Sequence, residues 1–233
     1  MKSTKLIFLF LTLFIISSSA QSKKASTKAK TPKWQSLFDG KTMNGWRTFQ
    51  DKENDTWEIK DGALHCKPVS EAKLRADLIS ADQFENFELS MEWKITPNGN
   101  SGIMFRVSED YERTYYSGPE YQVLDDEGYK DKETALHFTG ANYDMHPTSQ
   151  KKLKPVGEWN ETRILVNKNH VEHWLNGQKI LEYEIGSDDW NTRKENSKWK
   201  NVKGYAVPTK GHIALQDHDS EAWFRNIKIR IIE

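Results

Sequence analysis

The clearest pattern along the chain is a strict alternation of apolar and polar residues over positions 87–95. A period of two indicates a β-strand with one buried face. A second alternating run covers 103–107, and the Asn-Gly of segment 98–102 lies between the two runs. This arrangement is typical of a β-hairpin. The second run divides into two sides, with Ile103, Phe105 and Val107 on one side and Met104 and Arg106 on the other.

Further short strands are predicted along the rest of the chain. Residues 57–59 and 63–66 flank a tight Asp61-Gly62 turn, which indicates a second hairpin. The other predicted strands cover 118–124, a meander at 162–166, 171–175 and 179–183, and a closing pair at 212–216 and 222–232. No segment shows sustained helical spacing of apolar residues. The pattern predicts an all-β sandwich or jelly roll of one domain.

Two long polar stretches, 128–156 and 186–208, interrupt the strand pattern without clear periodicity. Connections of this length are uncommon in a compact domain unless they have a function. We therefore expect them to form functional loops over one face of the sandwich.

The N-terminus has the layout of a secretory signal peptide over residues 1–20. Lys2 and Lys5 precede an apolar run at 6–16, and small residues end at Ala20, the expected cleavage site. The run is shorter than the roughly 20 residues that span a bilayer, which disfavours a membrane anchor. Residues 21–33 are predicted to be a disordered linker, so the globular domain covers 34–233 and the protein is periplasmic or secreted.

Charge and cysteine content narrow the function classes. From Trp34 onward the chain holds 27 basic and 34 acidic residues, a net charge of −7. That balance argues against nucleic acid as a partner. Cys66 is the one cysteine, so the domain has no internal disulfide and relies on its core. We expect Cys66 to be a buried small hydrophobe rather than a nucleophile.

Polar side chains opposite the core face of several predicted strands could converge in one groove. The groove would hold Arg106, Glu120, Gln122, Gln216 and His218. Carboxylates and amides hydrogen-bond hydroxyl groups, and the same set contains candidates for acid–base catalysis. An ordinary charged sheet face is the alternative interpretation. Among the nine tryptophans, those near turns or long loops are the candidates for stacking on a sugar: Trp159, Trp174, Trp190 and Trp199.

Evidence for a metal site is weak. The seven histidines show no zinc-like spacing, and the chain has no P-loop or dinucleotide-binding motif. The segment 217–221 brings three carboxylates together and could hold calcium. A solvated turn is the favoured interpretation of that segment.

Several sequence blocks, in this order along the chain, resemble the 3-keto-disaccharide hydrolase domain family. They are Trp34-Gln35-Ser36-Leu37-Phe38-Asp39-Gly40-Lys41 with Gly45-Trp46, Asn100-Ser101-Gly102-Ile103 with Arg106, Gly118-Pro119-Glu120-Tyr121-Gln122 with Asp125, Gly157-Glu158-Trp159-Asn160, His173-Trp174-Leu175-Asn176-Gly177, and Leu215-Gln216-Asp217-His218 with Phe224-Arg225-Asn226-Ile227. The match runs from about Trp34 to Ile232. One departure is Asp219, where the family usually has glycine after the histidine.

The resemblance implies a concanavalin-like jelly-roll sandwich of two antiparallel sheets with long loops over the concave face. It also implies an exported enzyme whose substrate is a small carbohydrate, a 3-keto-glucoside or disaccharide. A ketone at C3 acidifies the C2 proton, so a base can remove it and the C1 aglycone can leave by elimination. Water addition then gives net hydrolysis. No cofactor is implied, and whether a divalent metal assists the enolate stays open.

The resemblance also suggests roles for individual residues. Glu120 and His218 would act as base and acid partners, and Arg106 would stabilise the enolate oxygen. The substrate-binding candidates are Gln122, Asp125, Gln216, Tyr143, His173 and Glu92. Two other functions remain open on the same fold, a non-catalytic carbohydrate-binding module and a conventional glycosidase with two carboxylates.

Overall fold

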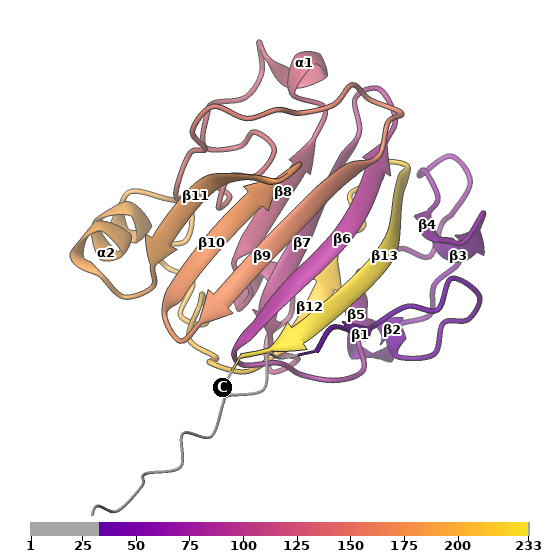
Figure 1. Cartoon of the computed structure of the whole chain (residues 1–233), viewed down its shortest axis with the longest axis horizontal. Coiled ribbons are helices and arrows are strands. Elements are labelled where there is room, and N and C mark those ends of the chain that lie inside the picture. Colours follow the sequence, from indigo (N-terminus) through magenta and orange to yellow (C-terminus); the bar gives the residue numbers. More distant parts are fainter. Residues whose placement is uncertain (1–32, 233) are drawn as a thin grey trace, which may run out of the picture. The chain divides into compact units, whose positions relative to one another are not determined.

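The structure is a computed structural model that describes residues 33–232 (Figure 1). The predicted signal peptide at 1–20 and all but the last residue of the predicted linker at 21–33 lie outside the described residues. The boundaries of these segments and the export of the protein therefore stay predictions. In the described part of the chain, no helix is both long enough and apolar enough to cross a lipid bilayer.

Two antiparallel sheets make up the described part of the chain. The larger sheet has eight strands in the order β11-β10-β9-β6-β13-β4-β3, with β1 paired to β13, and the smaller has five in the order β2-β5-β12-β7-β8. The larger sheet contains β1 (Gln35–Ser36), β3 (Trp57–Lys60), β4 (Ala63–Cys66), β6 (Phe87–Ile95), β9 (Asn160–Asn167), β10 (His170–Leu175), β11 (Gln178–Glu184) and β13 (Ala222–Ile231). The smaller contains β2 (Trp46–Thr48), β5 (Leu78–Ser80), β7 (Asn100–Val107), β8 (Glu120–Leu124) and β12 (His212–Leu215).

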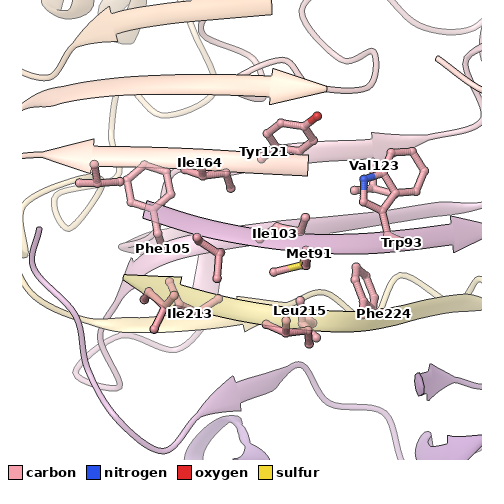
Figure 2. Packing of buried hydrophobic residues seen from close by; sticks show 14 of the residues in the cluster. Met91, Trp93, Ile103, Phe105, Tyr121, Val123, Ile164, Ile213, Leu215 and Phe224 are labelled. Atoms are coloured by element: carbon pink, nitrogen blue, oxygen red, sulfur yellow. The ribbon is translucent and has the colours of Figure 1, made fainter. Parts of the chain in front are cut away.

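The main core lies between the two sheets (Figure 2). Met91 and Trp93 of β6 face it from the larger sheet, and Ile103 and Phe105 of β7 face it from the smaller one. Trp93 keeps its polar atom paired, because Nε1 donates a hydrogen bond of 2.8 Å to Thr162 Oγ1. Burial of each such large side chain contributes about 1.5–3 kcal/mol. The predicted all-β jelly-roll sandwich of two antiparallel sheets is confirmed.

Several local predictions are confirmed in detail. The strand predicted at 87–95 is β6, and the meander is β9, β10 and β11, paired in that order. Strands β3 and β4 form the predicted hairpin. Asp61 and Gly62 at its turn have φ values of 52° and 75°, which a two-residue hairpin turn requires at both central positions.

The predicted hairpin between 87–95 and 103–107 is wrong. Strand β6 pairs with β9 and β13 in the larger sheet, whereas β7 pairs with β8 and β12 in the smaller one (Figure 1). The reason is that both strands carry one strongly apolar face. These faces meet across the core, so the Asn-Gly segment connects two sheets instead of two neighbouring strands.

The predicted sides of β7 are also wrong at its end. Arg106 has a left-handed backbone with φ of 57°, and the register with β12 shifts at this point, which makes a β-bulge. The extra residue moves Val107 to the other face of the sheet, where it packs with Met104. The Arg106 guanidinium reaches instead to the carbonyl of Lys168, in the turn between β9 and β10 of the larger sheet.

The polar stretch at 186–208 contains a helix that the sequence pattern did not indicate. Helix α2 (Asp188–Glu195) begins after Ser187, whose side chain accepts a hydrogen bond of 3.2 Å from the Trp190 backbone N–H. Trp190 is its one buried residue, so no apolar stripe could form. The three remaining short helices are η1 (Phe49–Asp51), η2 (Thr114–Tyr116) and α1 (Asp126–Tyr129).

Candidate active site

A groove of two joined hollows lies on the outer face of the smaller sheet. Its floor adjoins a small apolar cluster in which Met104 and Ala214 pack beneath Phe49 and Tyr115. The smaller hollow has a volume of about 120 Å³ and is lined by Asn100, Tyr115, Glu120, Gln122, Tyr143, Lys198, Gln216 and His218. The larger hollow has a volume of about 300 Å³ and shares Tyr115, Gln216 and His218 with the first.

Glu120 is the buried carboxyl of the smaller hollow. It lies on β8 opposite Met104 of β7, and its Oε1 occupies space that a Cβ at Gly102 would fill. Only 4% of the residue is exposed, and within residues 33–232 no donor makes a hydrogen bond to its carboxyl. Burial raises the pKa of Glu120 to about 8, although the positive charge of Lys198 acts in the opposite direction.

Lys198 brings a positive charge to the rim of the smaller hollow. Its ammonium lies 3.9 Å from the centroid of the Tyr143 ring, a cation–π contact. Loss of surrounding water lowers the pKa of Lys198, and the attraction of Glu120 partly offsets that effect. Burial and the neighbouring Glu120 charge raise the pKa of Tyr143 to about 12. Both long polar stretches thus reach the groove, one through Tyr143 and the other through Lys198.

A column of aromatic rings holds the Lys198 segment in place. Trp199 stacks on Tyr205 with ring centroids 4.5 Å apart and an interplanar angle of 6°, and Tyr205 stacks on Trp190 of α2. Trp199 Nε1 also donates a hydrogen bond of 2.9 Å to the Tyr143 carbonyl. The two loops are therefore fastened to each other beside the groove.

Two amide oxygens of the smaller hollow have no hydrogen-bond partner among the described residues. They are Asn100 Oδ1 and Gln216 Oε1, and both are buried. The backbone of Gln216 is held firmly, since its N–H donates to the Gly102 carbonyl at 2.9 Å. A buried polar atom without a partner costs about 1–3 kcal/mol. Such a cost is typical of a site built to receive the donors of a ligand.

A charged network lines the larger hollow and positions His218. Asp77 accepts hydrogen bonds from Thr114 Oγ1 and, at 2.9 Å, from the Asp217 backbone N–H. Asp217 in turn forms an ion pair with Arg75. His218 follows directly and is exposed at the boundary of the two hollows. The loop after β12 is thus fixed at Asp217, while the imidazole next to it stays accessible.

Asp219 occupies the position at which glycine was expected. Its φ is 62°, in the left-handed region that favours glycine but that aspartate also enters. Its carboxylate lies 3.7 Å from Arg75 Nε. The loop therefore keeps a glycine-type backbone and places an additional carboxylate at the wall of the larger hollow.

The structure brings together five of the nine site residues predicted from the sequence. These are Glu120, Gln122, Gln216, His218 and Tyr143, which all line the smaller hollow. Asp125, which lies at the end of β8, caps helix α1 instead, because its carboxylate accepts hydrogen bonds from the backbone N–H groups of Asn98 (2.8 Å) and Gly128 (3.1 Å).

The other three predicted residues lie away from the groove. Arg106 is withdrawn by the β-bulge and lines neither hollow. His173 of β10 is buried, its Nδ1 lies 2.8 Å from the Gly140 carbonyl oxygen, and burial lowers its pKa to about 4. Glu92 belongs to the larger sheet and accepts a hydrogen bond of 2.7 Å from Arg225. The structure therefore does not bring Arg106, His173 and Glu92 to the groove.

The aromatic residues that line the groove are Phe49, Tyr115 and Tyr143, and none of the predicted tryptophans lines it. Trp190 and Trp199 are buried in the aromatic column. Trp174 lies on β10 and Trp159 directly precedes β9, and each ring lies beneath an arginine whose guanidinium carbon is 3.8 Å from the ring centroid. Tyr115 and Tyr143 line the smaller hollow, which none of these tryptophans reaches.

The carboxylates of segment 217–221 do not converge on a cation site. Asp217 pairs with Arg75, whereas Glu221 Oε1 lies 2.9 Å from His65 Nε2. In the described part of the chain, one other group could hold a metal ion, His170, Glu172 and Glu182. It belongs to the larger sheet, and the Lys179 ammonium already contacts both glutamates. Cys66 is fully buried, as expected for a small hydrophobe, and burial raises the pKa of its thiol.

Sequence reasoning missed three residues of the smaller hollow: Asn100, Tyr115 and Lys198. Asn100 could have been found, because it shares the outer face of β7 with Gly102 and Met104. Lys198 carries no such signal, since it follows a helix without an apolar stripe in a stretch rich in lysine.

Comparisons with known proteins identify relatives of this chain. A 3-keto-disaccharide hydrolase of Bacteroides thetaiotaomicron is 34% identical over 225 residues, which are 84% of this chain and 78% of the relative. The crystal structure of a candidate glycosyl hydrolase from Parabacteroides distasonis matches with 34% identity and a TM-score of 0.78, covering 86% of this chain and 94% of that chain. The laminarinase of Rhodothermus marinus, with 6% identity and a TM-score of 0.52 over 88% of this chain and 100% of that chain, shares the fold alone.

The sequence model of one family matches residues 33–230, almost the whole described part of the chain. The match includes both sheets and every residue that lines the smaller hollow. This chain belongs to the family of 3-keto-alpha-glucoside-1,2-lyase-like domains.

Proposed function

We propose that this protein cleaves glycosides whose C3 hydroxyl has been oxidised to a ketone, by removal of the C2 proton and elimination of the C1 substituent. The observation that carries the proposal is the environment of Glu120. A buried carboxyl whose pKa is raised to about 8 faces a lysine and two amide oxygens without partners. The name of the Bacteroides thetaiotaomicron relative, a 3-keto-disaccharide hydrolase, supports the same substrate class.

In the first step Glu120 acts as the base. Its carboxylate takes the proton from C2, which the neighbouring ketone has made acidic, and the electron pair moves toward the C3 oxygen. A carboxylate with a raised pKa is a stronger base than one in water. The Lys198 ammonium and the Tyr143 hydroxyl lie in the same hollow and stabilise the negative charge on that oxygen. Lys198 thus takes the role expected for Arg106.

In the second step His218 acts as the acid. The enolate collapses, the bond from C1 to the leaving oxygen breaks, and the imidazolium of His218 gives that oxygen its proton. The location of His218 supports this role, because it lines both hollows and so lies where a bond between two substrate units would cross.

Water addition runs through the same groups in reverse. The unsaturated ketone accepts water at C1, His218 takes the proton of that water, and Glu120 returns its proton to C2. Both residues then regain their starting protonation states, and the net reaction is hydrolysis. Asn100, Gln122 and Gln216 bind the remaining hydroxyl groups of the ring. We further propose that the enzyme works after export, as the predicted signal peptide at 1–20 suggests.

The test compares an oxidised glucoside with its unoxidised parent in deuterium oxide. We expect cleavage of the 3-keto-glucoside alone, with deuterium appearing at C2 of the released sugar. Glu120→Gln and His218→Ala should each lower kcat at least about tenfold, while the matched surface variants Glu127→Gln and His170→Ala keep full activity. Binding of both glucosides without cleavage would identify a carbohydrate-binding module. Cleavage of the unoxidised glucoside without deuterium at C2 would identify a conventional glycosidase.

A further inference from the structure

We propose that His137 and Asp144 are positioning residues of the reaction, which hold the Tyr143 hydroxyl and the Lys198 ammonium in the arrangement that meets the C3 oxygen of the substrate. The inference rests on the proposed function and adds to it the residues that set the geometry of the enolate-stabilising groups. Its basis is one carboxylate that contacts both loops of the groove and one imidazole that stacks on Tyr143.

Asp144 joins the two loops through its side chain. Its Oδ1 lies 2.9 Å from His137 Nε2, and its Oδ2 accepts a hydrogen bond of 2.7 Å from the Lys198 backbone N–H. The backbone of Asp144 has a φ of 59°, a left-handed conformation that is uncommon outside glycine but that aspartate enters. Such conformations persist where surrounding contacts fix the residue, and they are frequent at functional sites.

His137 is held at both ring nitrogens. Its Nδ1 contacts the Glu133 carboxylate, and its Nε2 faces Asp144. These two contacts fix the plane of the imidazole. That plane is nearly parallel to the ring of Tyr143, with ring centroids 4.5 Å apart and an interplanar angle of 13°. The Tyr143 ring is thus stacked on a side chain that is itself fixed, as a precise site requires.

The network sets the position of Tyr143 and Lys198 relative to the base. The Tyr143 backbone N–H donates a hydrogen bond of 3.1 Å to the Glu120 carbonyl, and the Lys198 ammonium lies 3.9 Å from the Tyr143 ring centroid. A misplacement of about 1 Å can lower a rate on the order of a hundredfold. Loss of the network should therefore slow formation of the enolate. Substrate binding should change little, since the charge on the C3 oxygen develops only in that step.

Two variants of Asp144 form a matched test. Glycine and asparagine both suit the left-handed backbone, but only Asp144→Asn keeps an oxygen for the Lys198 N–H. We expect Asp144→Gly to lower kcat on a 3-keto-glucoside about tenfold with KM within about threefold, and Asp144→Asn to recover most of that loss. Unchanged kcat in Asp144→Gly, or an equal loss in both variants, would overturn the role of Asp144.

A double-mutant cycle tests whether His137 acts through Tyr143. His137→Phe keeps a flat ring beside Tyr143 but loses both contacts with carboxylates. We expect this change to lower kcat about tenfold in the unaltered protein and to have little effect in Tyr143→Phe, which has no hydroxyl group to orient. A merely structural role of His137 would lower kcat by the same factor in both backgrounds, and that result would overturn the proposal.

Failure of the proposed function would give a different result. If the unaltered protein cleaves no 3-keto-glucoside, the proposed reaction is contradicted, and the rate of trypsin cleavage after Lys198 then tests the arrangement alone. Asp144→Gly should be cut faster at this bond than the unaltered protein or Asp144→Asn, because the Lys198 segment loses the hydrogen bond that holds it. Equal cleavage rates in the three proteins would overturn the positioning role of Asp144.

Discussion

Glu120 of β8 and Gly102 of β7 are diagonal neighbours on two paired strands, and the carboxyl of Glu120 occupies the space that a side chain at Gly102 would need. The absence of a side chain at Gly102 therefore leaves the room that the Glu120 carboxyl occupies. The position of the proposed base depends on an atom that Gly102 lacks, and this dependence can be tested directly.

Gly102→Ala should lower activity more than it lowers stability. The added methyl group would overlap the Glu120 side chain itself, which must move, and small-to-large changes in packed regions cost about 1–3 kcal/mol. We expect kcat on a 3-keto-glucoside to fall at least about tenfold, because a displaced carboxylate is no longer aligned with the proton on C2. Steady-state kinetics and urea unfolding measure the two effects. Unchanged kcat in a folded variant would contradict the proposed place of the base.

The pH dependence of the reaction should report the raised pKa of Glu120. The base must be ionised, so kcat/KM should rise with pH, and the midpoint of that rise should lie at about pH 8. In Lys198→Met the positive charge that favours the carboxylate is lost, and the midpoint of the rise in kcat/KM should move to higher pH. Rate profiles of the two proteins decide the matter. A midpoint at the ordinary pKa of a glutamate, or a midpoint that Lys198→Met does not change, would argue against Glu120 as the base.

The same burial should make Glu120 a cost to stability at neutral pH. Its folded-state pKa lies above the unfolded value, so the native protein binds the extra proton and the free energy of unfolding falls as pH rises from about 4.5 to about 8. Glu120→Gln should then be more stable than the unaltered protein at pH 8, on the order of 4 kcal/mol when the raised pKa is converted to free energy. The difference should vanish near pH 4. Urea unfolding of both proteins at the two pH values measures it.

Arg106→Met should leave catalysis nearly unchanged. Arg106 is buried, lines neither hollow and directs its guanidinium to the Lys168 carbonyl. Replacing a buried charge by an apolar side chain of similar length is often tolerated. We expect kcat/KM within about threefold of the unaltered protein, measured beside Lys198→Met, which should lose far more. A large loss of kcat in a folded Arg106→Met protein would restore the role that the sequence suggested.

Mature protein from the native host should begin at Gln21. The prediction follows from the small residues that end at Ala20 after an apolar run. N-terminal sequencing of protein recovered from the periplasm or medium measures it. An intact Met1 on the purified protein would contradict the signal peptide.

The parts of the fold that depend on local patterns could be predicted from the sequence. The alternation in β6 and the Asp61-Gly62 turn are properties of neighbouring residues, and so is the shared face of Glu120 and Gln122. The sheet to which β7 belongs was not predictable in this way, because one apolar face suits either pairing.

The missed parts of the site depend on backbone events and loops. A single left-handed residue at Arg106 reverses the side on which the rest of β7 points, and no composition rule indicates it. Lys198 reaches the groove only because the aromatic column under it holds a polar loop in place. Such placement arises from contacts between distant segments, which alternation and spacing do not record.

Glu120 projects from a paired strand, whereas Tyr143 and Lys198 arrive on the two loops that the column of rings ties together. The proposed base is thus fixed on a strand of the smaller sheet, whereas the two groups proposed to stabilise the enolate lie on loops. Changes in those two loops can therefore alter the substrate while the sheets and Glu120 stay the same. Relatives with different substrates should accordingly differ from this chain mainly in the segments that correspond to residues 128–156 and 186–208, and less in the sheets.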